Sequence, residues 1–579
     1  MTARQSRKAA KRPRSEAKPS GVHKRQPAKR PRSEAQPSEV IVVGSGGAAL
    51  VAALAAADAG ARVAVLEKTA QIGGTTGMSG GLVWVPCNPQ MAAEGEPDDE
   101  AAALAYLRTL AAGRSEEALL RAVLASGPEM VRFLERATTL RFETLDKPDY
   151  HPELPGARRS RRCLAPNVFE RARLGEWGER VRTGAIYSLP MSWREFDAMN
   201  AAFHPERLDL RLVEERFAKG LVGMGTALVS HLLLACLERG IEVLRETRAV
   251  ELLLEAEAGR PPRVRGVVAR RTGGEAVAFA AERGVILACG GFEWNPELVR
   301  RFSAGPVAHP LSNPANEGDG LRMAMAAGAD LANMYDLLRF PAANIPGELY
   351  DGRPLARMVV GERGLPHAIL VNRRGRRFVN EAHNYTDVAR AYGDFDPVAY
   401  EFANHPSFAI FDAQFRAQYS VLGVPPGAPE PEGVLRAGSL RELAAQAGID
   451  ADGLGATVAR WNGFVREGRD RDFRRGESFF DTYYADMGRE PSATLGSIER
   501  PPFFALRVGC GVIGTNGGPR TDAHGRVQHV SGEPIPGLYA CGDAAASAIG
   551  PGYGGPGGPL GQGFSMGFRA GRHAAGETR

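Results

Sequence analysis

The chain has 579 residues, of which 44% are hydrophobic and 24% charged. This balance is typical of a soluble globular enzyme and argues against a largely disordered protein. The formal charge of +5 is uneven: residues 1–38 hold 12 Lys and Arg against 2 Asp and Glu, so the rest of the chain holds 60 basic and 65 acidic residues, a net of −5.

Several classes of protein are disfavoured by what the sequence lacks. The six cysteines form no C-x-x-C pair, and no His/Cys group has metal-ligand spacing, so we expect no metal site and a reduced, cytoplasmic protein. No run of about 18 apolar residues is present, which argues against a membrane span. The first residues lack the apolar core of a secretory signal.

Residues 1–38 contain a near-identical basic repeat, KRPRSEAKPS at 11–20 and KRPRSEAQPS at 29–38. Such a segment has almost nothing apolar to bury, and we predict that it is disordered. It is either a basic arm for nucleic acid or an anionic membrane, or a solvated extension without catalytic consequence. The second interpretation is favoured because the rest of the chain shows no further basic footprint.

A nucleotide-binding βαβ unit is predicted directly after this segment. The residues EVIVV from Glu39 indicate a buried strand, Ala48–Ala59 a helix, and Arg62–Glu67 a second, parallel strand. The turn Gly44-Ser45-Gly46-Gly47-Ala48-Ala49 matches G-x-G-x-x-A, whose glycines permit the tight turn and the approach of a pyrophosphate to the helix N-terminus. Glu67 closes the second strand, where a carboxylate can accept hydrogen bonds from ribose hydroxyls.

NAD and FAD share this fingerprint, and three further segments favour FAD. Gly73-Gly74-Thr75-Thr76, followed by Ser79-Gly80-Gly81, can run beside a pyrophosphate and a flavin. The segments 285–291 (VILACGG) and 537–543 (GLYACGD) resemble strands of FAD enzymes, and in the second Asp543 would hydrogen-bond the ribityl chain. We therefore predict a non-covalently bound FAD.

The remaining patterns suggest that both chain ends build the nucleotide-binding domain. A helix is predicted over Gly225–Arg239, a strand over Ile241–Leu244, and antiparallel strands through residue 287. The stretch 302–507 has mixed character and no nucleotide motif, whereas a second glycine-rich block occupies 542–563. We predict an FAD-binding domain from 39–301 and 508–579, with a substrate-binding and catalytic domain at 302–507.

Ordered blocks along residues 39–575 resemble the fumarate reductase and 3-ketosteroid dehydrogenase superfamily of flavoproteins, most closely the 3-ketosteroid Δ1-dehydrogenases. Among them are GGTTGMSGGLVWVP (73–86), PDYHPELPGAR (148–158), NEGDGLRMAMAAGA (316–329), GRRFVNEAHNYTD (375–387) and GYGGPGGPLG (552–561). The resemblance implies an α/β fold: a Rossmann-like FAD-binding domain of the glutathione reductase type, with an inserted α+β substrate domain.

The same resemblance implies the cofactor site. Its residues are Gly44, Gly46, Gly47, Ala48, Glu67, Lys68, Gly74, Thr75, Thr76, Ser79, Gly80, Gly81, Val250, Ala288, Gly290, Gly542, Asp543, Gly558 and Leu560.

The implied reaction is the dehydrogenation of a 3-ketosteroid-like ketone at the α,β carbon–carbon bond, with a proton passing to a tyrosine and a hydride to flavin N5. By resemblance, Tyr553 and the Gly557 N–H polarise the carbonyl, Tyr385 accepts the proton, and Tyr150 supports Tyr385. A free tyrosine has a pKa of about 10, so such a base needs support from its neighbours. The apolar segment 81–86 is expected to line the pocket of a hydrophobic ketone.

An alternative is an ene-reductase or fumarate-type reductase acting on another enone or enoate, because the reaction direction depends on an electron acceptor or donor that the sequence does not identify. Fumarate reductases carry an arginine at the offset from Asn380 where this chain has Tyr385, which favours a neutral ketone. Gly554, Pro556 and His383 depart from the family pattern, where Pro or Ala usually follows the loop tyrosine and a small residue stands at 556.

Overall fold

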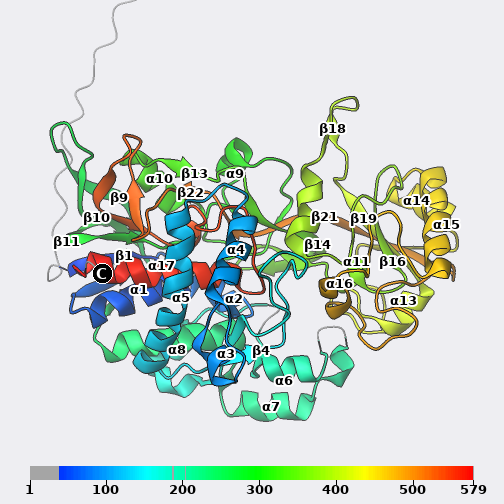
Figure 1. The fold of residues 1–579 in the computed structure, drawn as a ribbon, viewed down its shortest axis with the longest axis horizontal. Coiled ribbons are helices and arrows are strands. Elements are labelled where there is room, and N and C mark those ends of the chain that lie inside the picture. The colour runs from blue at the N-terminus through cyan, green and yellow to red at the C-terminus, as the bar shows by residue number, and fades with distance from the viewer. Residues whose placement is uncertain (1–37, 186–187, 202–203, 578–579) are drawn as a thin grey trace, which may run out of the picture.

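The computed structural model describes residues 38–185, 188–201 and 204–577, and two large sheets organise them (Figure 1). The disorder predicted for residues 1–38 concerns a segment that, apart from Ser38, lies outside this description. Among the described residues, no helix has the length and apolar composition needed to cross a bilayer.

The first sheet contains the predicted βαβ unit and draws strands from both ends of the chain. Its strand order is β23-β24-β11-β1-β2-β8, with β10 and β9 continuing from the N-terminal half of β11. The pairings β24–β11–β1–β2–β8 are parallel, whereas β23 runs antiparallel to β24. The strands are β1 (Ser38–Val43), β2 (Val63–Leu66), β8 (Glu242–Leu244), β9 (Thr247–Glu255), β10 (Arg263–Arg271), β11 (Ala276–Leu287), β23 (Arg526–Gln528) and β24 (Pro534–Ala540).

Helix α1 (Gly47–Asp58) is buried on almost every side, and small residues let its neighbours approach closely. A Cβ added to Gly567 or Gly571 of α17 (Gly558–Ala574) would lie 2.6 Å from Ala48 O or 2.3 Å from Ala52 O. The glycines therefore allow the last helix of the chain to lie directly against the first. Figure 1 shows the two helices side by side.

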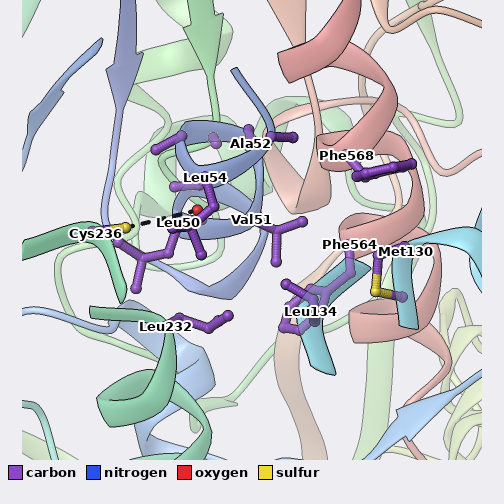
Figure 2. Close-up of a cluster of buried hydrophobic side chains, with 14 of the residues drawn as sticks. Leu50, Val51, Ala52, Leu54, Met130, Leu134, Leu232, Cys236, Phe564 and Phe568 are labelled. Atoms are coloured by element: carbon purple, nitrogen blue, oxygen red, sulfur yellow. Dashed lines mark hydrogen bonds between the residues drawn. The ribbon is translucent and has the colours of Figure 1, made fainter. Parts of the chain in front are cut away.

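A hydrophobic core surrounds α1 and fixes its position over the sheet. Figure 2 shows Leu50 and Leu54 of α1 among side chains from three other helices. These partners are Leu232 and Cys236 of α8 (Met224–Glu238), Met130 and Leu134 of α5 (Glu117–Ala137), and Phe564 and Phe568 of α17. Because the nucleotide turn directly precedes α1, this packing fixes the turn as well.

The second sheet is antiparallel except for the short strand β12, and it is built mainly from the middle of the chain. Its order is β15-β14-β21-β19-β16, with β12 and β20 also paired to β21. The strands are β12 (His309–Pro310), β14 (Leu337–Tyr350), β15 (Arg353–Met358), β16 (Ala368–Asn372), β19 (Ser407–Asp412), β20 (Val434–Ala437) and β21 (Phe503–Thr515). The domain boundary predicted at residue 507 falls inside β21, whose pairing with β14 continues to Thr515.

The remaining elements cover the two sheets or connect them. The other helices are α2 (Gly74–Met78), α3 (Pro89–Ala93), α4 (Glu100–Ala111), α6 (Trp193–Ala198), α7 (Leu210–Ala218), α9 (Pro296–Phe302), α10 (Asp319–Ala326), α11 (Gly361–Gly364), α12 (Tyr385–Arg390), α13 (Ala413–Gln418), α14 (Leu440–Ala447), α15 (Ala451–Glu467) and α16 (Phe479–Tyr483). The short strands are β3 (Val83–Trp84), β4 (Phe142–Leu145), β5 (Cys163–Pro166), β6 (Phe169–Glu170), β7 (Leu221–Val222), β13 (Leu331–Ala332), β17 (Phe395–Asp396), β18 (Glu401–Phe402) and β22 (Gly518–Pro519).

Candidate active site

A cavity of about 830 Å³ is lined by residues of both sheets and contains most of the predicted site. The predicted catalytic residues that line it are Tyr150, Tyr385, Tyr553 and Gly557. The predicted cofactor-binding residues that line it are Gly44, Gly46, Gly47, Ala48, Glu67, Lys68, Gly74, Thr75, Thr76, Ser79, Gly80, Gly81, Ala288, Gly290, Gly542, Asp543 and Leu560.

Two predicted cofactor-binding residues, Val250 and Gly558, do not line the cavity. Val250 lies between Ala249 and Glu251 at an irregularity in the pairing of β9 with β10. Its residue is 37% exposed, so its side chain is not placed to contact a ligand in the cavity. Gly558 instead faces the ring of Tyr553, 3.2 Å from the position that a Cβ would occupy.

Gly44 and Gly46 of the nucleotide turn serve different steric purposes. Gly44 has a φ of +106°, and a Cβ there would lie 2.4 Å from Ala288 O. At Gly46 the nearest heavy atom to an added Cβ is Thr76 Oγ1 at 3.8 Å, so this glycine leaves room on the cavity side. Gly46 also precedes α1 without a side-chain cap, which leaves helix N–H groups available to an anion in the cavity.

Glu67 follows β2 at the cavity wall and is buried. Its Oε2 accepts from Ser45 Oγ at 2.6 Å, and its Oε1 accepts from Thr69 N and Oγ1 at 2.8 and 2.9 Å. These bonds hold the carboxyl group in a fixed orientation, with acceptor capacity left for a diol. Lys68 is held differently, since its Nζ lies 3.0 Å from Asp319 Oδ2.

Several polar residues line the same end of the cavity but were not assigned a ligand role from sequence, among them Arg248, Asn313 and Asn316. Asn316 Nδ2 donates to Thr75 Oγ1 at 3.1 Å and to the buried Glu293 at 2.8 Å. For Asn316 the signal in the sequence was the block at 316–329. This block resembles the superfamily but does not reveal which of its polar side chains faces a ligand.

Asp543 is a half-buried residue whose carboxyl group lines the cavity wall, just after β24. Burial raises its pKa to about 8, the charge of Glu293 adds to the shift, and the Thr515 main chain opposes it. A Cβ at Gly514 would lie 2.1 Å from Asp543 Oδ2, so the neighbouring strand needs a glycine to admit the carboxyl. A buried carboxyl of this kind is expected to accept a hydrogen bond from a ligand.

Three tyrosines that are distant in sequence meet at the other end of the cavity. Tyr385 Oη lies 3.0 Å from Tyr150 Oη and 2.9 Å from Tyr553 Oη. The rings of Tyr150 and Tyr553 stack with centroids 5.0 Å apart, and Tyr385 meets both edge-on. Tyr385 opens α12, which Asn384 caps, while Tyr553 lies in the glycine loop before α17.

Burial raises the pKa of all three tyrosines, but the neighbouring hydroxyls distinguish them. For Tyr385, burial is opposed by the hydrogen bonds of Tyr150 and Tyr553 and by the charge of Arg363. For Tyr150 and Tyr553, the neighbouring groups add to the effect of burial and the pKa is raised well above its usual value. Tyr385 is therefore the member whose phenolate the site stabilises best.

The loop that carries Tyr553 is held by hydrogen bonds to its backbone. Gly554 O accepts from Tyr106 Oη at 2.8 Å and from Tyr150 N at 3.0 Å. Gly557 has a φ of +90°, and a Cβ there would lie 2.3 Å from Leu82 O. The Gly557 N–H lines the cavity and has no hydrogen-bond acceptor among the described residues, so it remains available to a ligand carbonyl.

Trp84 explains why the loop has glycine at 554. A Cβ at Gly554 or Gly555 would lie 2.5 or 2.6 Å from the indole ring, whose Nε1 donates to Asp149 Oδ1 at 2.7 Å. The predicted apolar lining at 81–86 is thus only partly observed: Gly81 and Leu82 reach the cavity, whereas Trp84 packs behind the loop.

The cations in this half of the cavity already have partners. Lys147 Nζ lies 2.7 Å from Asp197, and Arg357 makes two hydrogen bonds to Glu348 at 2.8 and 3.0 Å. Arg363 donates to main-chain carbonyl oxygens. Most of the remaining wall is apolar, including Leu82, Leu189, Trp193, Phe196, Leu338, Met358, Leu365, Phe480 and Ile513.

Comparison with known proteins gives consistent results. The profile of a family described as "FAD binding domain" matches residues 39–560. The chain is 40% identical to 4-oxocyclohexanecarboxylate 2-dehydrogenase of Sinomonas cyclohexanicum, with 93% of each chain covered. It is 34% identical to 3-oxosteroid 1-dehydrogenase of Mycobacterium tuberculosis, with 93% of this chain and 98% of the relative covered.

A solved structure is similar over nearly the whole chain. It is the 3-ketosteroid Δ1-dehydrogenase of Sterolibacterium denitrificans in complex with 1,4-androstadiene-3,17-dione. The TM-score is 0.87 at 34% sequence identity, and the match covers 93% of this chain and 99% of the other.

Proposed function

The chain belongs to the FAD-binding family whose profile matches residues 39–560, and on this basis we propose that Tyr553, Tyr385 and Tyr150 carry out its reaction on a cyclic ketone. The chain is an FAD-dependent oxidoreductase that dehydrogenates a ketone at a CH–CH bond. The observation that carries the proposal is the contact of the three tyrosine hydroxyls, in the same cavity as the Gly557 N–H.

The residues at the other end of the cavity fit FAD. The open face of Gly46 and the α1 N-terminus suit a pyrophosphate, Glu67 suits a ribose diol, and the buried Asp543 carboxyl suits a ribityl hydroxyl. When bound, FAD supplies the two-electron acceptor for the oxidation. The low-dielectric surroundings of Asp543 make a hydrogen bond to it stronger than one in water.

The tyrosines divide the remaining chemistry between them. Tyr553 Oη and the Gly557 N–H donate to the ketone oxygen and stabilise the negative charge that develops there. Tyr385 accepts the proton from the carbon next to the carbonyl, since its phenolate can accept a hydrogen bond from the Tyr150 hydroxyl while Tyr553 donates to the ketone oxygen. Tyr150 supports that phenolate and orients it.

The substrate proposed is a neutral, hydrophobic, 3-ketosteroid-like ketone. The two most relevant relatives act, by their names, on 4-oxocyclohexanecarboxylate and on a 3-oxosteroid. An acidic substrate would require a cation free to bind its carboxylate, but Lys147 and Arg357 are each paired with a carboxylate of the protein. The mostly apolar wall therefore supports the neutral ketone.

The proposal is tested by mixing the FAD-loaded protein anaerobically with candidate substrates and following the visible absorbance of oxidised flavin. A 3-ketosteroid is expected to bleach the flavin faster than 4-oxocyclohexanecarboxylate. Fumarate, which can only be reduced, should leave oxidised flavin unchanged but reoxidise reduced flavin if the chain is a fumarate-type reductase. Bleaching by neither ketone would contradict the proposal.

The rate of flavin reduction should rise with pH. Only the phenolate of Tyr385 accepts a proton, and burial raises its pKa above the ordinary value of about 10. The phenolate fraction therefore grows with pH over roughly pH 7–10. Tyr150→Phe removes a hydrogen bond that lowers this pKa, so the variant should be slower at neutral pH and its rise should move to higher pH. A pH-independent rate, or an unshifted profile in the variant, would count against this role.

Gly554→Ala should disturb the tyrosine loop because its new methyl group would overlap Trp84. Overpacking of this kind costs about 1–3 kcal/mol of unfolding free energy, and displacement of Tyr553 should slow turnover by up to roughly 10²-fold. Trp84→Phe, which vacates part of the ring, should partly rescue Gly554→Ala in a double-mutant cycle. Gly455→Ala, with no heavy atom within 4 Å of the new Cβ, is the control and should leave turnover unchanged. Strict additivity of the two substitutions would contradict the clash.

A further inference from the structure

A second group of side chains, outside the cavity, includes His383 and Asn384, which directly precede Tyr385. His383 and Asp387 lie one turn apart around the start of α12, and His151 approaches them from the connection between β4 and β5. None of the three lines the cavity. Sequence spacing did not reveal the group because His151 is far from the other two in the chain.

The three side chains converge on a common point. One ligand atom from each lies within 4.8 Å of the other two. His151 Nε2 is 2.8 Å from Asp387 Oδ2, and His383 Nε2 is 4.0 Å from the same oxygen. Such a triangle can be spanned by a cation with bonds of about 2.0–2.2 Å after small side-chain adjustments.

Each imidazole also has a carboxylate on its Nδ1 side, where metal-binding histidines usually have an outer partner. His151 Nδ1 lies 3.3 Å from Glu153 Oε1, and His383 Nδ1 lies 3.8 Å from Asp481 Oδ1. A carboxylate that accepts from Nδ1–H leaves Nε2 as the metal-binding nitrogen once its proton is displaced, and it raises the basicity of Nε2 as a ligand. Both Nε2 atoms face Asp387. Each imidazole therefore lies between a carboxylate on its Nδ1 side and the proposed metal position on its Nε2 side, as in a metal site.

Asn384 fills the centre of this arrangement with a hydrogen-bond donor. Its Nδ2 donates to Asp387 Oδ2 at 2.7 Å and lies 3.5 and 3.4 Å from the Nε2 atoms of His151 and His383. The amide thus takes the position that a metal would occupy, and a metal would also displace the proton shared by His151 Nε2 and Asp387 Oδ2, which lie 2.8 Å apart. Bound metal would replace these contacts, while Asn384 Oδ1 continues to cap α12 through the Asp387 N–H.

We propose that His151, His383 and Asp387 form a binding site for a divalent transition metal, with Zn²⁺ the best match. Two imidazoles and one carboxylate are a ligand set that Zn²⁺ accepts, with water completing a tetrahedron. The side chains are 20–30% exposed, which leaves an entry path and room for that water. Ca²⁺ and Mg²⁺ are disfavoured because they prefer oxygen ligands.

The site would link two segments that each carry a proposed catalytic tyrosine. His151 follows Tyr150 directly, and His383 and Asp387 flank Tyr385. A metal held by both segments would restrain the separation of the two hydroxyls, now 3.0 Å. The site is therefore a clamp and takes no part in the redox chemistry.

The test uses the full-length, FAD-loaded protein, dialysed against a chelator and titrated with Zn²⁺ by calorimetry. One Zn²⁺ per chain is expected. His151→Gln, His383→Gln and Asp387→Asn should each weaken binding by at least the roughly 10–100-fold that loss of an outer partner costs, and Glu153→Gln by roughly tenfold. His529→Gln, a histidine bonded to Ser531 in another part of the fold, is the matched control and should bind as the wild type does.

Two results would overturn the site. One is substoichiometric Zn²⁺ binding by the wild-type protein, and the other is unchanged affinity in His383→Gln with flavin still bound. X-ray absorption at the zinc edge of the wild-type protein does not depend on how the variants fold. It should show two imidazole ligands and light oxygen ligands, and fewer than two imidazoles would equally refute the assignment.

Discussion

Phenylalanine in place of Tyr553 is expected to slow flavin reduction by the ketone roughly 10²–10³-fold, the usual cost of removing one oxyanion donor. The ring would still stack on Tyr150, 5.0 Å away, so the loop should keep its shape. The hydroxyl that donates to the ketone oxygen would be lost, leaving the Gly557 N–H as the remaining donor. The measurement is the rate of flavin bleaching at saturating substrate under anaerobic conditions.

Tyr400→Phe provides the matched control for this variant. Tyr400 is 82% exposed beside β18, so removing its hydroxyl should change neither the rate nor the flavin content. The Tyr553 variant should retain FAD, because its effect is on the chemical step. Wild-type rates in Tyr553→Phe would remove this residue from the mechanism, whereas loss of flavin would indicate a structural role.

Tyr385→Phe should have an effect as large or larger, roughly 10²–10⁴-fold, because the proton acceptor itself is removed. Its hydroxyl lies between those of Tyr150 and Tyr553, and no other group of the trio has both neighbours within 3.0 Å. The variant should also lose the rise of rate with pH, since that rise reports the phenolate of Tyr385. The measurement is the anaerobic reduction rate across the alkaline range.

Two further readouts separate Tyr385 from Tyr553. Deuterium on the carbon next to the carbonyl should give a larger isotope effect in Tyr385→Phe, because abstraction of that proton becomes limiting. A substrate-like phenol, which resembles the enolate, should bind nearly normally to Tyr385→Phe but more weakly to Tyr553→Phe. If the phenol bound weakly to Tyr385→Phe and normally to Tyr553→Phe, Tyr385 would be the donor to the ketone oxygen and Tyr553 the base.

The departures of this chain from its family pattern are best understood from the tertiary structure. Gly554, where the resemblance leads us to expect Pro or Ala, faces the indole of Trp84, which leaves no room for a Cβ. His383 and Asn384 meet His151 outside the cavity and so belong to a group that no local motif could show. In both cases the partner is a side chain from a distant part of the sequence.

The sequence by itself determined the features that depend on neighbouring residues. The strand, glycine turn, helix and acidic residue from β1 to Glu67 follow from hydrophobic periodicity and from the steric needs of a turn, which act over a few residues. The predicted helix at 225–239 and strand at 241–244 correspond to α8 and β8 for the same reason. The strand that ends before Asp543 is likewise a local pattern.

Only the tertiary structure decided what depends on side-chain direction and long-range packing. The contact of Tyr150, Tyr385 and Tyr553 joins three distant segments, and it arises because both sheets and the glycine loop meet at one cavity. The exposure of Val250 accompanies an irregularity in the pairing of β9 with β10, and the extent of β21 to Thr515 follows from its pairing with β14. Strand register and interdomain packing are set by the burial of whole surfaces, so no window of neighbouring residues contains enough information to fix them.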